Sequence, residues 1–356
     1  MRNNKISTKL NKMMKLSGGA FVILLVGIFA SCNLKSTDST SEGVLASETV
    51  AIESGLTNGD QDVVDSEDVS ENVSEEDEIY LSTLGVVEES EIPKEDMKAM
   101  ERDYFYNLLS NKEKEHFRHM YASMLTDPHA IIKLDSIDLD VDRAIEAYTN
   151  SSFFFSFGNS WGVENQFCYK GATYVTFSFI EGTDLDAYRA DLDRVVSGAS
   201  EYDDFYSRCK YVYDFCVENY TYDEENKEDL TNHVASGVGD KAAVCQTFAC
   251  FCNVAFSKLG IRSVYVTSEV VQGESHAWNL IFNPKTGLWY HFDANAGIIG
   301  DQYHFWCLTG TIIANDIDKV GLHNIQNYNA LLHPNYEISE KVFDPDKDNY
   351  LIADYL

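Results

Sequence analysis

Three residues with the functional groups of a thiol-based catalytic triad occur in the order Cys245, His276 and Asp293. A thiol can attack a carbonyl carbon, an imidazole can take and return the proton, and a carboxylate can hold the imidazole in one tautomer. Each residue also has a more ordinary interpretation, as a buried cysteine, a hydrogen-bonded strand histidine or a turn aspartate. The elements that carry the three residues therefore decide whether they can meet.

The cysteine precedes a run of apolar residues at helical spacing, which extends from Phe248 to Leu259 and is followed by Gly260. This pattern predicts a buried helix that ends where the glycine follows. Cys245 would lie in the first turn, where unpaired backbone N–H groups and the helix dipole stabilise an anion. We therefore expect the pKa of this thiol to lie below the free value of roughly 8.5.

The histidine and the aspartate belong to a predicted β-hairpin. Strand-like segments follow the helix at residues 263–267, 276–282 and 288–293, and residues 283–287 form a turn between the last two. Folding this hairpin about residue 285 places His276 opposite Asp293, within one position. Cross-strand neighbours lie roughly 5 Å apart at Cβ. Strand pairing should therefore bring the imidazole to the carboxylate, and the helix start should deliver Cys245 to both.

The flanking residues resemble the transglutaminase-like superfamily, whose members have a papain-like cysteine-enzyme fold. The resemblance lies in Val244-Cys245-Gln246, in Leu259-Gly260-Ile261 after the helix, in His276-Ala277-Trp278-Asn279, and in the strand that ends in Asp293. It implies that Cys245, His276 and Asp293 are the catalytic residues, and it covers roughly residues 200 to 310, with a loose extension back to about residue 100. The agreement in order, spacing and flanking residues favours the triad over the ordinary interpretations.

The same resemblance assigns a role to an aromatic residue before the nucleophile, and it has two departures. In relatives such an aromatic can help form the oxyanion hole, which would implicate Tyr222; His233 matches another residue common in relatives, with a structural role. The chain has Thr247-Phe248-Ala249 where relatives have Gly-Tyr-Ala, and Ala294-Asn295 where relatives often have Thr-Trp. These departures affect substrate access and the product side of the cleft.

Other histidines and cysteines have simpler interpretations. His291 is interpreted as a surface or structural residue, with a polar group in the cleft as the alternative, and Cys250 and Cys252 as packing thiols. The chain has 8 cysteines, of which we expect most to be free thiols. It contains no Cys-x-x-Cys or His-Glu-x-x-His spacing, so we expect neither a metal nor an organic cofactor.

The N-terminus has the pattern of a bacterial lipoprotein signal over residues 1–31. A basic start is followed by a short apolar segment from Ala20 to Ala30, and small residues stand directly before Cys32. Such a segment is short for a membrane-spanning helix. We expect lipidation of Cys32 and anchoring at the extracytoplasmic face of the cell membrane. An ordinary signal peptide or an uncleaved anchor is the alternative.

Residues 32–91 have the composition of a disordered acidic tether. No Lys or Arg occurs from Asp38 to Glu91, and few aromatic residues are available to form a core. This segment contributes to a net charge of −31, which argues against nucleic acid as a partner and against direct adhesion to anionic lipid. The membrane link should be the lipid alone.

The remaining residues divide into three predicted parts: a helical and strand-rich lead domain at 92–199, a catalytic domain at 200–310 and a C-terminal extension at 311–356. In the lead domain, Ser110 and Glu113 form a predicted capping box, and strands are expected at 131–134, 152–157, 166–169 and 174–180. The predicted fold class is α+β. Its transglutaminase-like core packs a central nucleophile helix on an antiparallel sheet.

The sequence therefore predicts a surface-anchored cysteine enzyme that acts on amide bonds of peptides or proteins, including cell-wall material, through a thioacyl intermediate. Hydrolysis is favoured because bacterial proteins with these motifs are mostly thought to be proteolytic. Three alternatives remain: amine transfer to a protein glutamine, a non-catalytic module that binds peptide or cell-wall material, and a scaffold at the cell surface or division site.

Overall fold

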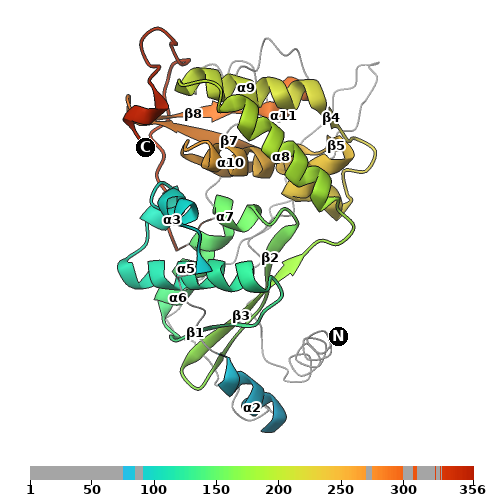
Figure 1. Ribbon diagram of the computed structural model, residues 1–356, viewed down its shortest axis with the longest axis vertical. Helices are drawn as coiled ribbons and strands as arrows, with labels where there is room; N and C mark the ends of the chain where they lie inside the picture. The colour runs from blue at the N-terminus through green and yellow to red at the C-terminus, as the bar shows by residue number, and fades with distance from the viewer. Residues whose placement is uncertain are drawn as a thin grey trace, which may run out of the picture.

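The computed structural model describes residues 75–84, 91–269, 275–299, 308–310, 325, 329 and 331–356 (Figure 1). The predicted signal sequence, Cys32 and most of the predicted tether lie outside these residues. Within the described part of the chain, no helix has both the length and the apolar character needed to cross a membrane.

The lead region begins with short helices that pack against a small sheet. The helices are α3 (Lys94–Met100), α4 (Tyr104–Asn107), α5 (Asn111–Thr126), α6 (Leu139–Thr149) and α7 (Ser152–Phe155). The predicted capping box at the start of α5 is confirmed: the amide of Ser110 donates to Glu113 Oε2 at 2.6 Å, and the amide of Glu113 donates to Ser110 Oγ at 3.4 Å. The strands are β1 (Ile132–Leu134), β2 (Ser160–Tyr169) and β3 (Ala172–Phe179), antiparallel in the order β1-β3-β2.

The strand predicted at residues 152–157 is wrong, because this segment forms helix α7. Ser151 acts as its N-cap and accepts a hydrogen bond from the amide of Phe154 at 3.4 Å. Phe153, Phe154 and Phe155 are all buried, and their rings contact rings of three different elements, α5, β3 and β6 respectively. The aromatic run favours a strand locally. In the folded protein, a helical turn between two layers buries all three rings instead.

The last part of the predicted tether is also helical, which corrects the expectation of disorder for that segment. Helix α2 (Glu75–Thr83) lies at the edge of the lead sheet, where Leu81 packs with Tyr169 and Tyr174. An ion pair joins Glu78 to Lys170. The apolar trio around Leu81 provides the burial that the more acidic sequence before it lacks.

The second half of the described chain contains a helix on an antiparallel sheet, which confirms the predicted fold class. The elements before the sheet are α8 (Leu185–Ala199), α9 (Phe205–Asn219), β4 (Thr221–Tyr222), η3 (Leu230–His233), η4 (Ala235–Asp240), β5 (Ala242–Ala243) and α10 (Cys245–Lys258). The sheet has the order β6 (Ser263–Glu269), β7 (Ser275–Asn283) and β8 (Leu288–Phe292), and α11 (Ala294–Ile299) follows. Helix α10 contacts β6 and β7 on one side and α8 and α9 on the other, and all its residues from Cys245 to Phe256 are buried.

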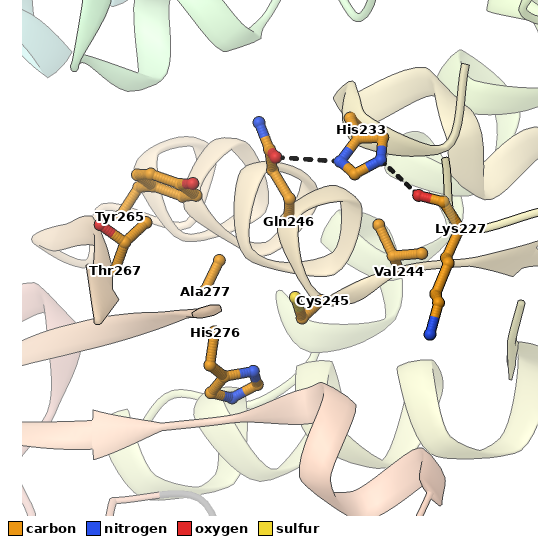
Figure 2. Close-up of a pocket in the computed structure, with 9 residues that line it drawn as sticks. All are labelled: Lys227, His233, Val244, Cys245, Gln246, Tyr265, Thr267, His276 and Ala277. Carbon is orange, nitrogen blue, oxygen red and sulfur yellow. Dashed lines mark hydrogen bonds between the residues drawn. The ribbon is translucent and has the colours of Figure 1, made fainter. Parts of the chain in front are cut away.

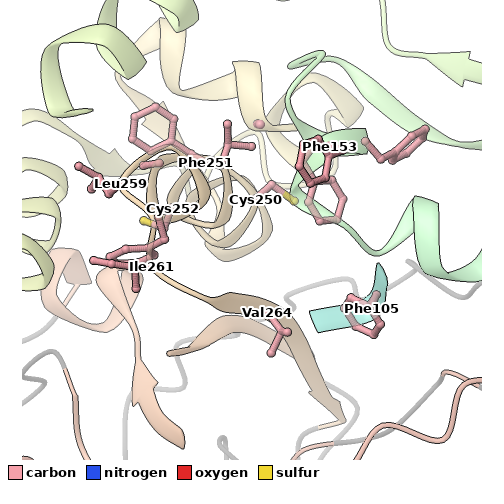
Figure 3. Close-up of a cluster of buried hydrophobic side chains, with 14 of the residues drawn as sticks. Phe105, Phe153, Cys250, Phe251, Cys252, Leu259, Ile261 and Val264 are labelled. Carbon is pink, nitrogen blue, oxygen red and sulfur yellow. The ribbon is translucent and has the colours of Figure 1, made fainter. Parts of the chain in front are cut away.

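The lead region and the helix-on-sheet region share one hydrophobic core. In Figure 3, Phe153 of the lead region lies near Cys250 of α10, and Phe105 of the lead region belongs to the same cluster of buried side chains. The ring of Phe155 also contacts that of Tyr265 on β6, with centroids 5.7 Å apart. The two regions are therefore packed directly against each other along one side of α10.

The C-terminal residues return to the sheet. The amide of Trp289 on β8 donates to Glu337 O, and the amide of Ser339 donates to Trp289 O, each at 2.8 Å. Phe343 stacks on Tyr206 of α9, and a last short helix, η5 (Ile352–Asp354), follows. The C-terminal part of the predicted extension is thus attached to the outer edge of β8 and to α9.

Candidate active site

Cys245 is the first residue of helix α10, as predicted, and its side chain is 5% exposed. The N-cap residue is Val244, whose side chain has no oxygen to accept hydrogen bonds from the first turn. The N-terminal backbone N–H groups of α10 are therefore not capped by Val244. This is the environment in which a developing negative charge is stabilised.

Tyr222 lies on the short parallel ladder that leads into the nucleophile segment. β4 pairs with β5 so that Tyr222 stands opposite Ala243, and the amide of Asp223 donates to Ala243 O at 2.9 Å. Tyr222 is thus placed beside the chain two residues before Cys245, and it is partly buried. It does not line the pocket described below, so its oxyanion role stays a prediction.

His276 and Asp293 are joined by a hydrogen bond between His276 Nε2 and Asp293 Oδ2 at 2.7 Å. His276 is 9% exposed and Asp293 is 7% exposed. The other carboxylate oxygen, Oδ1, accepts from the amide of Ala296 at 3.0 Å, in the first turn of α11. Asp293 therefore has both oxygens engaged, one by the imidazole and one by the backbone.

The predicted pairing of the hairpin is wrong by one step. Asn279 pairs with Phe292, and continuing this register puts Trp278 opposite the position of Asp293. The hairpin is centred one half-residue later than predicted, because Asn283 pairs with Leu288 around a turn that contains Gly287 at a φ of 75°. A half-residue shift of the centre moves every cross-strand partner by one residue, so the position opposite Asp293 is two residues from His276, not within one as predicted. His276 consequently reaches Asp293 along a diagonal.

A pocket at the start of α10 brings the cysteine and the histidine together (Figure 2). Its lining residues are Lys227, His233, Val244, Cys245, Gln246, Tyr265, Thr267, His276 and Ala277. Asp293 lies behind His276 and does not line the pocket. A substrate carbonyl in this pocket would meet the thiol and the imidazole, while the carboxylate stays covered.

Several lining residues were not predicted as site residues. His233 accepts or donates at both ring nitrogens: Nε2 lies 2.6 Å from Lys227 O, and Nδ1 lies 3.1 Å from Gln246 Oε1. It thus joins the loop of Lys227 to the residue after Cys245, in agreement with the structural role that the resemblance implied. Trp161 of the lead region lies edge-on to His233, with ring centroids 6.4 Å apart.

The lining residues differ in whether a sequence pattern could have predicted them. Tyr265 and Thr267 are two residues apart on β6 and share one face, so strand periodicity could have placed them together. Lys227 lies in a charged loop between β4 and η3, where no pattern pointed to the pocket. Its inclusion depends on the path of that loop.

The other described thiols on α10 differ from Cys245. Burial raises the pKa of Cys250; burial, and to a smaller extent a hydrogen bond with Cys216, raises the pKa of Cys252. The Sγ atoms of Cys216 and Cys252 are 3.7 Å apart. All six cysteines in the described part of the chain are free thiols. Among the described residues, no group of three or more His, Cys, Asp or Glu side chains is arranged to hold a metal ion.

Comparisons with known proteins find a family match over part of the chain. Residues 193–294 match the transglutaminase-like superfamily. This transglutaminase-like segment begins in α8 and ends just after Asp293, so it contains all three residues of the predicted triad. The comparison with curated proteins found no match.

Three solved structures are similar to parts of the chain. A structure described as a TGase has 16% identity and a TM-score of 0.28, and the match covers 46% of this chain and 51% of that one. A putative cysteine protease from Cytophaga hutchinsonii has 19% identity and a TM-score of 0.24, and the match covers 35% of this chain and 51% of that one. The periplasmic domain of TgpA from Pseudomonas aeruginosa, bound to ethylmercury, has 16% identity, a TM-score of 0.25 and coverage of 37% and 57%. The chain thus spans about half the length of these structures.

Proposed function

We propose that this protein is a cysteine-dependent enzyme that acts on amide bonds in peptides or proteins. Cys245 is the nucleophile, His276 is the base and Asp293 orients the imidazole. The observation that carries the proposal is the 2.7 Å hydrogen bond between His276 and Asp293 beside a pocket that both Cys245 and His276 line. The superfamily match over residues 193–294 supports it.

The roles of the ring nitrogens follow from this hydrogen bond. A carboxylate only accepts, so His276 Nε2 carries the proton that it shares with Asp293. Nδ1 is then the nitrogen that takes the proton of the Cys245 thiol. The resulting thiolate and imidazolium form beside the N-terminus of α10, which stabilises the negative partner.

The reaction proceeds in two halves. The Cys245 thiolate adds to the substrate carbonyl carbon, and the tetrahedral intermediate collapses as His276 protonates the leaving amine, which leaves a thioester on the enzyme. An acceptor then attacks the thioester carbonyl, His276 takes the acceptor's proton, and the thiolate leaves. We propose that N–H groups at the start of α10, with help from Tyr222, stabilise the oxyanion.

Water is the leading acceptor in this proposal, which gives a peptidase or amidase. A primary amine as acceptor gives a transglutaminase instead, and this second candidate is supported by the family match. The chemistry up to the thioester is the same in both cases, so one experiment can separate them.

The test uses the full-length chain with a mixture of unfolded protein substrates, with and without an added primary amine. Hydrolysis gives new peptide termini in the mass spectrum, and amine transfer gives glutamine side chains that carry the amine. Cys245→Ala should abolish either product. Cys250→Ala is the matched control, because it removes another buried thiol of α10 that does not line the pocket. Product formation that survives Cys245→Ala overturns the mechanism, whereas stable peptide binding without product by the parent protein favours the binding module.

We further propose that the protein is held at the extracytoplasmic face of the cell membrane by a lipid on Cys32. The support is the basic start, the short apolar segment and the small residues before this cysteine. Cys32→Ala should move the protein out of the membrane fraction, and retention there would contradict the lipid anchor.

A further inference from the structure

Three aromatic rings from β7 and β8 form a stack that begins at the proposed base. The ring of His276 lies over that of Trp278, with centroids 5.6 Å apart and planes 13° apart. The ring of His291 continues the stack at 6.0 Å and 28° from Trp278. The register explains this, because His276 and Trp278 are two residues apart on β7, and His291 pairs with Leu280, the next residue on the same face.

A hydrogen bond fixes the middle ring. Trp278 Nε1 donates to His291 Nδ1 at 3.0 Å. Since an indole N–H can only donate, His291 Nδ1 must carry a lone pair, and the ring proton of His291 must be on Nε2. His291 is therefore held in one neutral tautomer by Trp278.

His291 is also well fixed by its surroundings. Its side chain is 2% exposed, which excludes the surface interpretation. Its backbone makes two hydrogen bonds with Thr309, one in each direction, both at 2.9 Å. The acceptor for the indole is thus a buried side chain on a strand whose backbone is paired with both Leu280 and Thr309.

The hydrogen bond to Asp293 constrains the orientation of His276 at one atom, Nε2. That bond holds Nε2 at Oδ2, but the plane of the ring also depends on rotation about the Cβ–Cγ bond. A flat indole against its face restricts this rotation, provided that the indole itself holds its plane. The hydrogen bond from Trp278 to His291 holds that plane.

We propose that His291 is a positioning residue for the proposed base His276 and that it acts through Trp278. The inference rests on the proposed function, because it assigns His291 a part in directing Nδ1 of His276 toward Cys245. His291 itself does not line the pocket.

The test follows the rate of Cys245 alkylation by iodoacetamide against pH, measured by peptide mass mapping on the full-length chain. His291→Phe keeps a flat ring against Trp278 but removes the acceptor. His291→Asn offers an amide oxygen near the place of Nδ1, so it is the matched rescue variant. Trp278→Phe breaks the same hydrogen bond from the other side and keeps the inference testable if His291→Phe does not fold. Thermal unfolding of each variant reports on stability separately.

In the parent protein, Cys245 should react well below the pH at which an ordinary thiol does, as a thiolate–imidazolium pair requires. We expect His291→Phe and Trp278→Phe to slow alkylation near pH 6 by about fivefold, the fold-change that corresponds to one hydrogen bond of about 1 kcal/mol. His291→Asn should restore most of the rate. A purely structural His291 would lower the unfolding temperature in these variants and leave the pH profile unchanged, which overturns the inference.

His276→Ala, measured beside these variants, separates the two proposals. If it leaves the pH profile of Cys245 unchanged, no cysteine–histidine pair exists, and the proposed function and this inference both fail. If His276→Ala moves the profile while His291→Phe and Trp278→Phe do not, the proposed function stands and the positioning role of His291 is overturned.

Discussion

The hydrogen bond between His276 and Asp293 crosses the β7–β8 hairpin diagonally, not straight across it. The position opposite Asp293 belongs to Trp278, so the indole lies between the base and the part of β8 that carries His291. With this offset, Asp293 accepts a hydrogen bond from the first turn of helix α11 and also holds the imidazole. The proposed triad and the connection to α11 thus depend on the same carboxylate.

Replacement of Asp293 should separate these two roles. Asp293→Asn retains an oxygen to accept from Ala296, so we expect the unfolding free energy to change little. Asp293→Ala should destabilise the protein by about 1 kcal/mol, as the loss of a helix cap does. Both should slow Cys245 alkylation near neutral pH, because neither presents a negative charge to His276. Chemical denaturation and alkylation of the same samples measure the two effects, and equal stability losses in both variants would contradict the capping role.

Replacement of the other two proposed catalytic residues should leave the fold in place. Cys245→Ala removes one sulfur atom at the edge of the core, and its circular dichroism spectrum should match that of the parent. Turnover of any substrate found should fall by about four to six orders of magnitude, as with other covalent triads. His276→Ala should cost nearly as much, and Asp293→Ala less. Similar losses in the Cys250→Ala control would show that the effect comes from packing.

The thiols of α10 should differ sharply in reactivity. Burial raises the pKa of Cys250 and Cys252, so we expect both to resist alkylation in the folded protein even at about pH 8. They should react at ordinary rates once the protein is unfolded in denaturant. Peptide mass mapping of samples alkylated before and after unfolding gives the comparison. Fast labelling of Cys252 in the folded protein would mean that α9 and α10 separate readily.

A buried carboxyl in the lead region should make stability depend on pH. Burial raises the pKa of Asp103 to about 6, above its ordinary value of 3.8. The folded state therefore holds this proton more tightly than the unfolded state does, so the contribution of Asp103 to stability is present at low pH and is lost as pH rises from about 4 to about 6. The shift corresponds to about 3 kcal/mol at most.

Asp103→Asn should remove that dependence and keep the N-cap of α4, because an amide oxygen can still accept from the amide of Tyr106. Denaturation of both proteins at several values between about pH 4 and about pH 7 gives the difference in unfolding free energy. We expect the unfolding free energy of the variant to increase relative to that of the parent as pH rises. A constant difference across this range would show that Asp103 does not change its protonation on unfolding there.

Local sequence patterns predicted the elements whose ends are marked by specific residues. The capping box at Ser110 and the glycine after α10 both mark ends that depend on nearby hydrogen bonds and backbone freedom, so they can be inferred from a short window. Local patterns likewise placed Cys245 at the start of a helix and placed His276 and Asp293 on a hairpin.

What could not be predicted depends on contacts between distant segments. Helix α7 buries all three of its phenylalanines against residues from distant segments of the chain. A short sequence window contains no information about these contacts. The hairpin register depends on the conformation of the turn at residues 284–287, and the small error in its predicted centre put His276 opposite Asp293. Lys227 enters the pocket only because its loop folds back to His233.

The return of the C-terminal chain to β8 restricts how an extended peptide can bind. Backbone groups of Trp289 are bonded to Glu337 and Ser339, and those of His291 to Thr309, so hydrogen-bonding groups on the outer side of β8 are already occupied. A peptide cannot join the sheet there as an additional strand unless it displaces these residues. The protein's own tail thereby closes one route of strand addition, and it leaves the pocket at the start of α10 as the described approach to Cys245.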